Sequence, residues 1–135
     1  MKLVVDEDGS DLASELWNTA QPVASSILAY PEGRAALAAA QRSGRLSRRA
    51  FEQAVADFEQ IQSELVSIGV DEALAHHAGE LAEGLGLRGY DAVHLASALG
   101  LGGEETALIT WDLDLHAAAE HVGLGVAGSG LRDER

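Results

Sequence analysis

Apolar residues recur every three or four positions in several segments of the chain, a spacing that predicts amphipathic helices. The predicted helices start with one capped by Ser10 or Asp11, followed by residues 27–41, 47–61, 72–85, a segment carrying Asp91, and 115–121. Short or alternating apolar runs between turn residues predict strands near 22–26, 66–70, 106–110 and 124–127. Strands that alternate with helices are typical of an α/β domain with a mostly parallel sheet.

Length and composition indicate a single globular domain. The chain has 135 residues, of which 47% are hydrophobic and 23% charged, so we expect one domain over residues 1–135 with a flexible tail from about residue 128. No apolar run reaches the roughly 18 residues of a membrane span, and no signal peptide opens the sequence. The absence of cysteine excludes disulfides, thiolate zinc sites and cysteine nucleophiles. We therefore expect a cytoplasmic protein that does not associate with membranes.

The charge balance is strongly acidic. Nine basic and 22 acidic residues give a formal net charge of −13, which argues against broad attraction to a phosphate backbone. Such a charge suits a protein that collects metal cations or binds a basic partner. It is equally consistent with a surface that simply keeps the protein soluble.

Three acidic residues occupy positions that a parallel sheet would bring close together. Asp91 lies near the start of an otherwise apolar helix, so it either caps that helix or meets a cation, because an unpaired buried carboxylate is costly. Glu32 follows the strand that ends near Ser26, and Asp112 follows the strand that ends at Thr110. Ligands of open α/β sheets bind outside the carboxyl ends of the strands. We therefore expect the three carboxylates to converge at one edge.

A carboxylate cluster of this kind is suited to metal-assisted hydrolysis. Oxygen ligands bind hard divalent cations such as Mg²⁺, and a bound metal orients and activates water for phosphodiester cleavage. Other roles remain open for each acid taken singly. Glu32 is also consistent with an exposed helix residue, and Asp112 or Asp114 with a helix cap.

Two competing patterns have little support. His76 and His77 are adjacent, and His116 and His121 are five residues apart, so neither pair shares a helix face as zinc ligands would. The run at residues 84–89 matches G-x-G-x-x-G. It comes after a predicted helix, however, whereas a dinucleotide site requires a preceding strand.

The motifs around these acids resemble those of a known family. The run Leu87–Ala98, with the letters LRGYDAVHLASA, is similar to the segment bearing the third acid of PIN-domain ribonucleases, particularly the VapC toxins of toxin–antitoxin pairs. Residues 108–115, LITWDLDL, resemble the family's strand followed by Thr-x-Asp, and residues 25–37 resemble the segment bearing its Glu. The resemblance covers nearly the whole chain in the expected order.

The resemblance implies a fold, a site and a set of partners. The fold would be a three-layer sandwich with a mostly parallel central sheet surrounded by helices. The metal acids would be Glu32, Asp91 and Asp112, with Asp114 as an auxiliary acid and Thr110 as a hydroxyl that orients the site. The family implies Mg²⁺ or Mn²⁺, an RNA substrate, a VapB-type antitoxin and a homodimer. The function would be that of a metal-dependent endoribonuclease toxin.

The sequence departs from the family at its start. Family members begin with a strand carrying the first metal-binding Asp, whereas residues 1–10 resemble the segment just after that motif, and Asp6 does not take its place. We expect either that the natural start lies upstream or that the chain is a truncated relative. The truncated case gives the alternative function, a catalytically impaired PIN-like module that binds an antitoxin without cleaving RNA.

Basic and apolar residues suggest where macromolecules would bind. The few arginines should line the RNA approach, with Arg34 and Arg88 as the candidates nearest the acids. Antitoxin binding would use apolar positions on the early helices, for which ordinary core packing is an equal alternative. These positions are Leu12, Leu16, Phe51, Val55 and Phe58.

Overall fold

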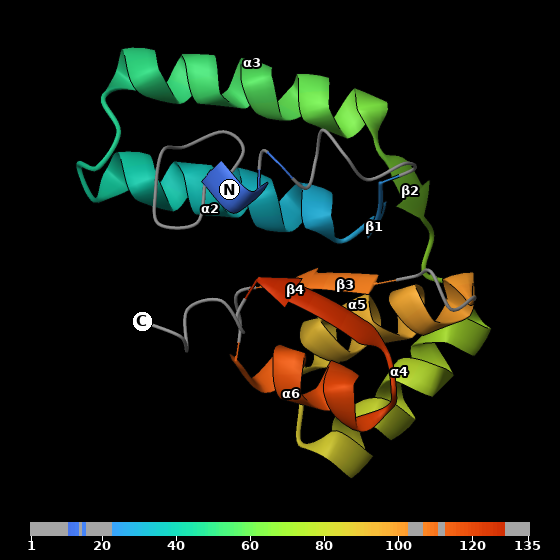
Figure 1. Cartoon of the computed structure of the whole chain (residues 1–135). Coiled ribbons are helices and arrows are strands. Elements are labelled where there is room, and N and C mark those ends of the chain that lie inside the picture. Colours follow the sequence, from blue (N-terminus) through green and yellow to red (C-terminus); the bar gives the residue numbers. More distant parts are fainter. Residues whose placement is uncertain (1–10, 14, 16–22, 103–106, 111–112, 129–135) are drawn as a thin grey trace. The chain divides into compact units, whose positions relative to one another are not determined.

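The computed structural model describes residues 11–13, 15, 23–102, 107–110 and 113–128 (Figure 1). The chain divides into two compact units, Met1–Ser67 and Ile68–Arg135. Whether these two units form the single domain expected over residues 1–135 is not tested by this division, so the single domain stays a prediction. Within the ranges just given, no helix has the length and apolar character needed to cross a membrane.

The first unit is built on a helical hairpin. Helix α2 (Ala29–Arg42) and helix α3 (Arg48–Glu64) lie side by side in Figure 1 and enclose an apolar cluster centred on Leu37, Ala54 and Phe58. The Ser47 Oγ accepts a hydrogen bond from the Ala50 amide at 3.1 Å and caps α3, as Ser does at helix starts. Strand β1 (Ala24–Ser26) pairs with strand β2 (Val66–Ile68) beside the hairpin.

The second unit combines three helices with a pair of strands. Its elements are α4 (Glu72–Leu85), α5 (Gly89–Leu101), β3 (Ala107–Thr110), α6 (Leu113–His121) and β4 (Gly125–Gly128). Strands β3 and β4 are parallel, in a register that matches Ala107 with Gly125 and Thr110 with Gly128. Helix α5 packs against α4, α6 and β3, and it supplies Ala92, Leu95 and Ala96 to the core. Small alanine side chains let these helices approach closely.

Local sequence signals explain where α4 begins and ends. The Asp71 Oδ1 accepts a hydrogen bond from the Leu74 amide at 2.8 Å and caps the helix. Gly86 stops the helix with a φ of 68°, the left-handed conformation that glycine adopts without steric cost. The chain then turns directly into α5, so Asp91 is held close to the end of a rigid helix pair.

The predicted elements are largely confirmed. Every helix predicted from residue 27 onward is present with ends within a few residues. The strands near 22–26, 66–70 and 106–110 are present in shortened form, and the strand near 124–127 is shifted by one residue. Asp11–Ala13 and Glu15 are helical, as the first predicted helix requires. Residues 1–10, Leu16 and the tail from residue 129 lie outside the described residues.

The described strands do not form a single central sheet. They make two separate pairs, β1 with β2 and β3 with β4. Each strand has only three or four residues, so few ladder hydrogen bonds form and most apolar burial comes from helix packing. The protein is α/β with mostly helices and a small parallel pair of strands.

Candidate functional site

Asp91 is a buried carboxylate in the first turn of α5. The residue is 7% exposed, and its neighbours Ala92 and Leu95 are fully buried in the second unit's core. The N-cap position of α5 belongs to Arg88, whose side chain makes no capping hydrogen bond. Asp91 is therefore not the N-cap of α5. The cation beside its carboxylate belongs to a side chain, and the predicted role of Asp91 as a metal ligand stays a prediction.

The cation is the guanidinium of Arg88. Its Nε donates to the Asp91 Oδ2 at 3.0 Å, across three residues of the chain. The Arg88 side chain remains 63% exposed while that of Asp91 is 9% exposed, so one face of the ion pair is open to solvent. The guanidinium carbon also lies 5.1 Å from the centre of the Tyr90 ring, within the range of a cation–π contact. The Arg88 guanidinium thus supplies the counter-charge that a buried carboxylate needs.

The strand β3 and helix α6 carry the next predicted site residues. Thr110 is the last residue of β3, and Asp114 lies exposed in the first turn of α6. Asp112 falls between these two elements and lies outside the described residues, as does the side chain of Thr110. Because α5 packs against both β3 and α6, the segments bearing Asp91, Thr110 and Asp114 belong to one packed unit.

Glu32 belongs to the other unit. It is exposed in the first turn of α2, where a carboxylate is favoured by the helix dipole. The predicted convergence of Glu32 with Asp91 stays a prediction, because the two residues lie in separate compact units.

An interhelical network includes Tyr30 and Arg34, each two residues from Glu32 in α2. The Tyr30 Oη donates to Glu59 Oε1 at 2.6 Å, and Arg34 Nη1 donates both to the Tyr30 Oη at 2.8 Å and to Glu59 at 3.2 Å. The Tyr30 ring also packs on Phe58, with 5.8 Å between ring centres. This network joins α2 to α3. Arg34, predicted to contact RNA, is thus held in place by an ion pair while about half of its side chain stays exposed.

The described residues contain no group of three His, Asp or Glu side chains that could hold a metal ion. This holds for the predicted histidine site and for the predicted carboxylate cluster, of which Asp112 lies outside the described residues. His76 lies beside Glu72 on exposed helix surface, and His116 pairs with Glu120 at 2.8 Å. The glycine run at 84–89 joins two helices, whereas the dinucleotide motif requires a preceding strand.

The structure describes four of the five apolar positions considered for antitoxin binding. Phe58 is 5% exposed in the first unit's core, and Phe51 and Val55 pack against it. These three residues pack in the apolar cluster of the hairpin, and antitoxin binding by the early helices stays a prediction. Leu12 is half-buried, and Leu16 lies outside the described residues.

The ion pair between Arg88 and Asp91 was missed from the sequence, although a signal was present. Residues three positions apart are neighbours on a helix surface, and here the arginine immediately precedes the helix that carries the acid. The network of Tyr30, Arg34 and Glu59 gave no such signal, because it joins residues 25 and 29 positions apart.

Similarity to known proteins extends over nearly the whole chain. Residues 1–121 match the model of the PIN domain family. The chain is 43% identical over 131 residues to two proteins of Mycobacterium tuberculosis, ribonuclease VapC45 of strain CDC 1551 / Oshkosh and ribonuclease VapC49 of strain ATCC 25618 / H37Rv. Each alignment covers 97% of this chain and 91% of the relative.

Proposed function

The chain belongs to the PIN-domain family, among the VapC ribonucleases, and we propose that it is a metal-dependent endoribonuclease toxin that hydrolyses RNA phosphodiester bonds. The observation that carries the proposal is the burial of the Asp91 carboxylate within the motif that resembles the segment bearing the family's third acid. A globular core tolerates such a charge only when it is compensated.

The donor set fits a hard divalent cation. Carboxylate oxygens are the ligands of Mg²⁺ and Mn²⁺, and we assign Asp91, Asp112 and Glu32 as metal ligands with Asp114 as an auxiliary acid. When bound, the metal would orient a water and stabilise the charge that develops at the phosphate. Support for Asp91 comes from its burial and its open ion pair. Support for the other three comes from the resemblance of their motifs.

The chain's own residues would position the reactants. Asp91 is held by the packed first turn of α5, so its carboxylate has little freedom to turn away. Arg88 neutralises this carboxylate before a metal arrives, and its solvent-exposed guanidinium is then placed to contact a substrate phosphate. Thr110, at the end of β3, would orient a neighbouring acid through its hydroxyl.

The test is Mg²⁺-dependent cleavage of RNA by the wild-type chain and by Asp91→Asn. Loss of the charge should abolish cleavage and also abolish the rise in melting temperature that Mg²⁺ gives the wild type. The matched control is Asp57→Asn, because Asp57 is exposed on α3 and makes only a surface hydrogen bond with Gln53, at 2.9 Å. Cleavage that survives Asp91→Asn would remove Asp91 from the site.

The same assay separates the enzyme from the impaired binding module. A folded wild-type chain that binds Mg²⁺ without cutting RNA would support the alternative. We propose a VapB-type antitoxin and a second copy of the chain as partners, on the strength of the family. Co-purification with the antitoxin and light scattering of the purified protein test these two associations.

A further inference from the structure

Positive charge is concentrated in one segment of this acidic protein. No acidic residue occurs between Glu32 and Glu52, whereas five of the nine basic residues lie there. Four of these five surround the turn between α2 and α3, and we call them the basic tip. The basic tip consists of Arg42, Arg45, Arg48 and Arg49.

The backbone that carries the basic tip is fixed by hydrogen bonds. The amides of Arg45 and Leu46 both donate to the Ala40 carbonyl, at 2.9 and 3.1 Å. Gly44 reverses the chain with a φ of 82°, and Leu46 packs into the apolar cluster of the hairpin. The arginines therefore project from a preorganised turn, which lowers the entropic cost of binding a ligand.

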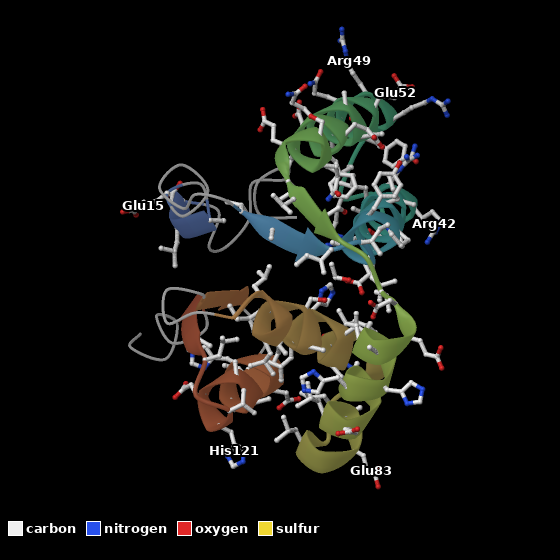
Figure 2. All side chains as sticks on the ribbon, turned by 90° about the vertical axis from the view of Figure 1, so that its right-hand side faces the viewer. Glu15, Arg42, Arg49, Glu52, Glu83 and His121 are labelled. Carbon is white, nitrogen blue, oxygen red and sulfur yellow. The ribbon has the colours of Figure 1, made fainter. Side chains whose placement is uncertain are left out.

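The side chains of the basic tip are available to a partner. All four arginines are exposed, and Figure 2 shows Arg42 and Arg49 pointing outward from the hairpin. Arg48 pairs with Glu52 at 3.3 Å, but both side chains are largely exposed, at 84% and 65%. Exposed pairs of this kind are weak and are easily exchanged for another anion.

The chemistry around the α3 start favours an anion. Its first turn contains no acidic residue, so the positive end of the helix dipole is uncompensated there. A hollow of about 630 Å³ lies on this surface, lined by Ser47, Arg49, Ala50, Glu52 and Gln53. Together with the four guanidinium groups, this makes a locally positive face on a chain of net charge −13.

We propose that the basic tip binds the phosphate backbone of the RNA substrate. The inference rests on the proposed ribonuclease function and adds the surface by which an acidic enzyme holds a polyanion. Guanidinium groups match phosphate oxygens in a bidentate geometry, and a local cluster attracts a polyanion even where the net charge repels it. Substitutions in the basic tip should lower the affinity for RNA, whereas substitutions of the proposed metal-binding acids should lower the rate of cleavage.

The experiment measures affinity for a short labelled single-stranded RNA in EDTA, where cleavage cannot occur. The double variant Arg42→Gln/Arg49→Gln should weaken binding by about fivefold per lost phosphate contact near 0.1 M salt, and should reduce the slope of log affinity against log salt by about 1.4. Arg42→Lys/Arg49→Lys should restore most of the affinity, because a phosphate is also bound by the lysine charge.

A matched control separates a local site from overall charge. Ala73→Glu/Ala75→Glu lowers the net charge by the same two units on exposed positions of α4 and should change affinity less than the arginine variant. Glu52→Gln should have the opposite effect and increase the RNA affinity about twofold, because it releases Arg48 from its ion pair. Circular dichroism of each variant checks that the helices are intact.

The outcomes distinguish this inference from the proposed function. Equal weakening by the arginine variant and the α4 control would overturn the basic tip as a site. Unchanged RNA affinity with lost antitoxin binding would overturn the RNA assignment and make the tip a protein-binding surface. In both cases a wild type that still cleaves RNA leaves the ribonuclease proposal standing, whereas a folded wild type that neither binds nor cleaves RNA contradicts the proposed function itself.

Discussion

Arg88 and Asp91 form an ion pair in which the partners differ sharply in burial. The Nε of Arg88 lies 3.0 Å from the Oδ2 of Asp91, and the two side chains are 63% and 9% exposed. The acid is held by the core, while the base reaches it from solvent. Such a pair keeps the buried charge compensated, and the partner that faces solvent is the guanidinium.

Removal of Arg88 should therefore lower stability in a metal-dependent way. We expect Arg88→Gln to reduce the free energy of unfolding by about 1 kcal/mol in EDTA, because the buried Asp91 loses its counter-charge. Excess Mg²⁺ should recover most of this loss if the metal occupies the same side of the carboxylate. Urea unfolding with and without Mg²⁺ measures both quantities.

Arg88→Lys and Arg88→Gln/Asp91→Asn serve as the controls for this prediction. The lysine variant keeps the charge and should lose less stability than the glutamine variant. In the double variant the buried charge is gone as well, so the two single losses should not add. A loss from Arg88→Gln that Mg²⁺ leaves unchanged would show that the two cations do not compete.

The α2–α3 hairpin should depend on the Tyr30 hydroxyl. We expect Tyr30→Phe to cost about 1 kcal/mol, because it removes the 2.6 Å bond to Glu59 and the bond from Arg34 while it keeps the ring against Phe58. Tyr30→Ala should cost more, since the ring contact is lost too. Thermal unfolding followed by circular dichroism gives the comparison. Equal losses for the two variants would assign the whole effect to the hydroxyl.

Gly86 allows a test of backbone strain alone. A Cβ added at this position meets no atom within 4 Å, yet the residue has a φ of 68°. We expect Gly86→Ala to destabilise the protein by about 1 kcal/mol through the left-handed conformation, without steric clash. Gly86→Asn should cost less, because asparagine tolerates this region better than alanine. Chemical denaturation resolves differences of this size, and an alanine variant as stable as the wild type would contradict the strain.

The helices could be predicted because their local signals agree with their packing. Ser47 and Asp71 cap α3 and α4 as their residue types suggest, and Gly86 ends α4 where the apolar spacing stops. The sheet was harder to predict. Short apolar runs identify strands but carry no information about which strands pair, and the described strands form two pairs instead of one sheet.

The candidate site was predictable to the extent that it is local. The acid at the start of the apolar helix could be identified from the sequence, but its ion pair with Arg88, three residues away, was not predicted. The hydrogen bonds that hold Arg34 depend on the packing of α2 against α3, which no spacing within one helix reveals. The association of Glu32 with Asp91 is likewise a long-range matter, and it rests on the family resemblance.

Glu32 can be tested without any assay of cleavage. If Glu32 and Asp91 share a metal, Glu32→Gln should weaken apparent Mg²⁺ affinity about tenfold, measured as the Mg²⁺ concentration that raises the melting temperature halfway. Glu83→Gln is the matched control, because Glu83 is an exposed helix residue on α4 and its loss changes the net charge equally. Equal shifts for both variants would mean that the carboxylate of Glu32 acts only through overall charge. A shift confined to Glu32 would identify its carboxylate as a ligand of the metal.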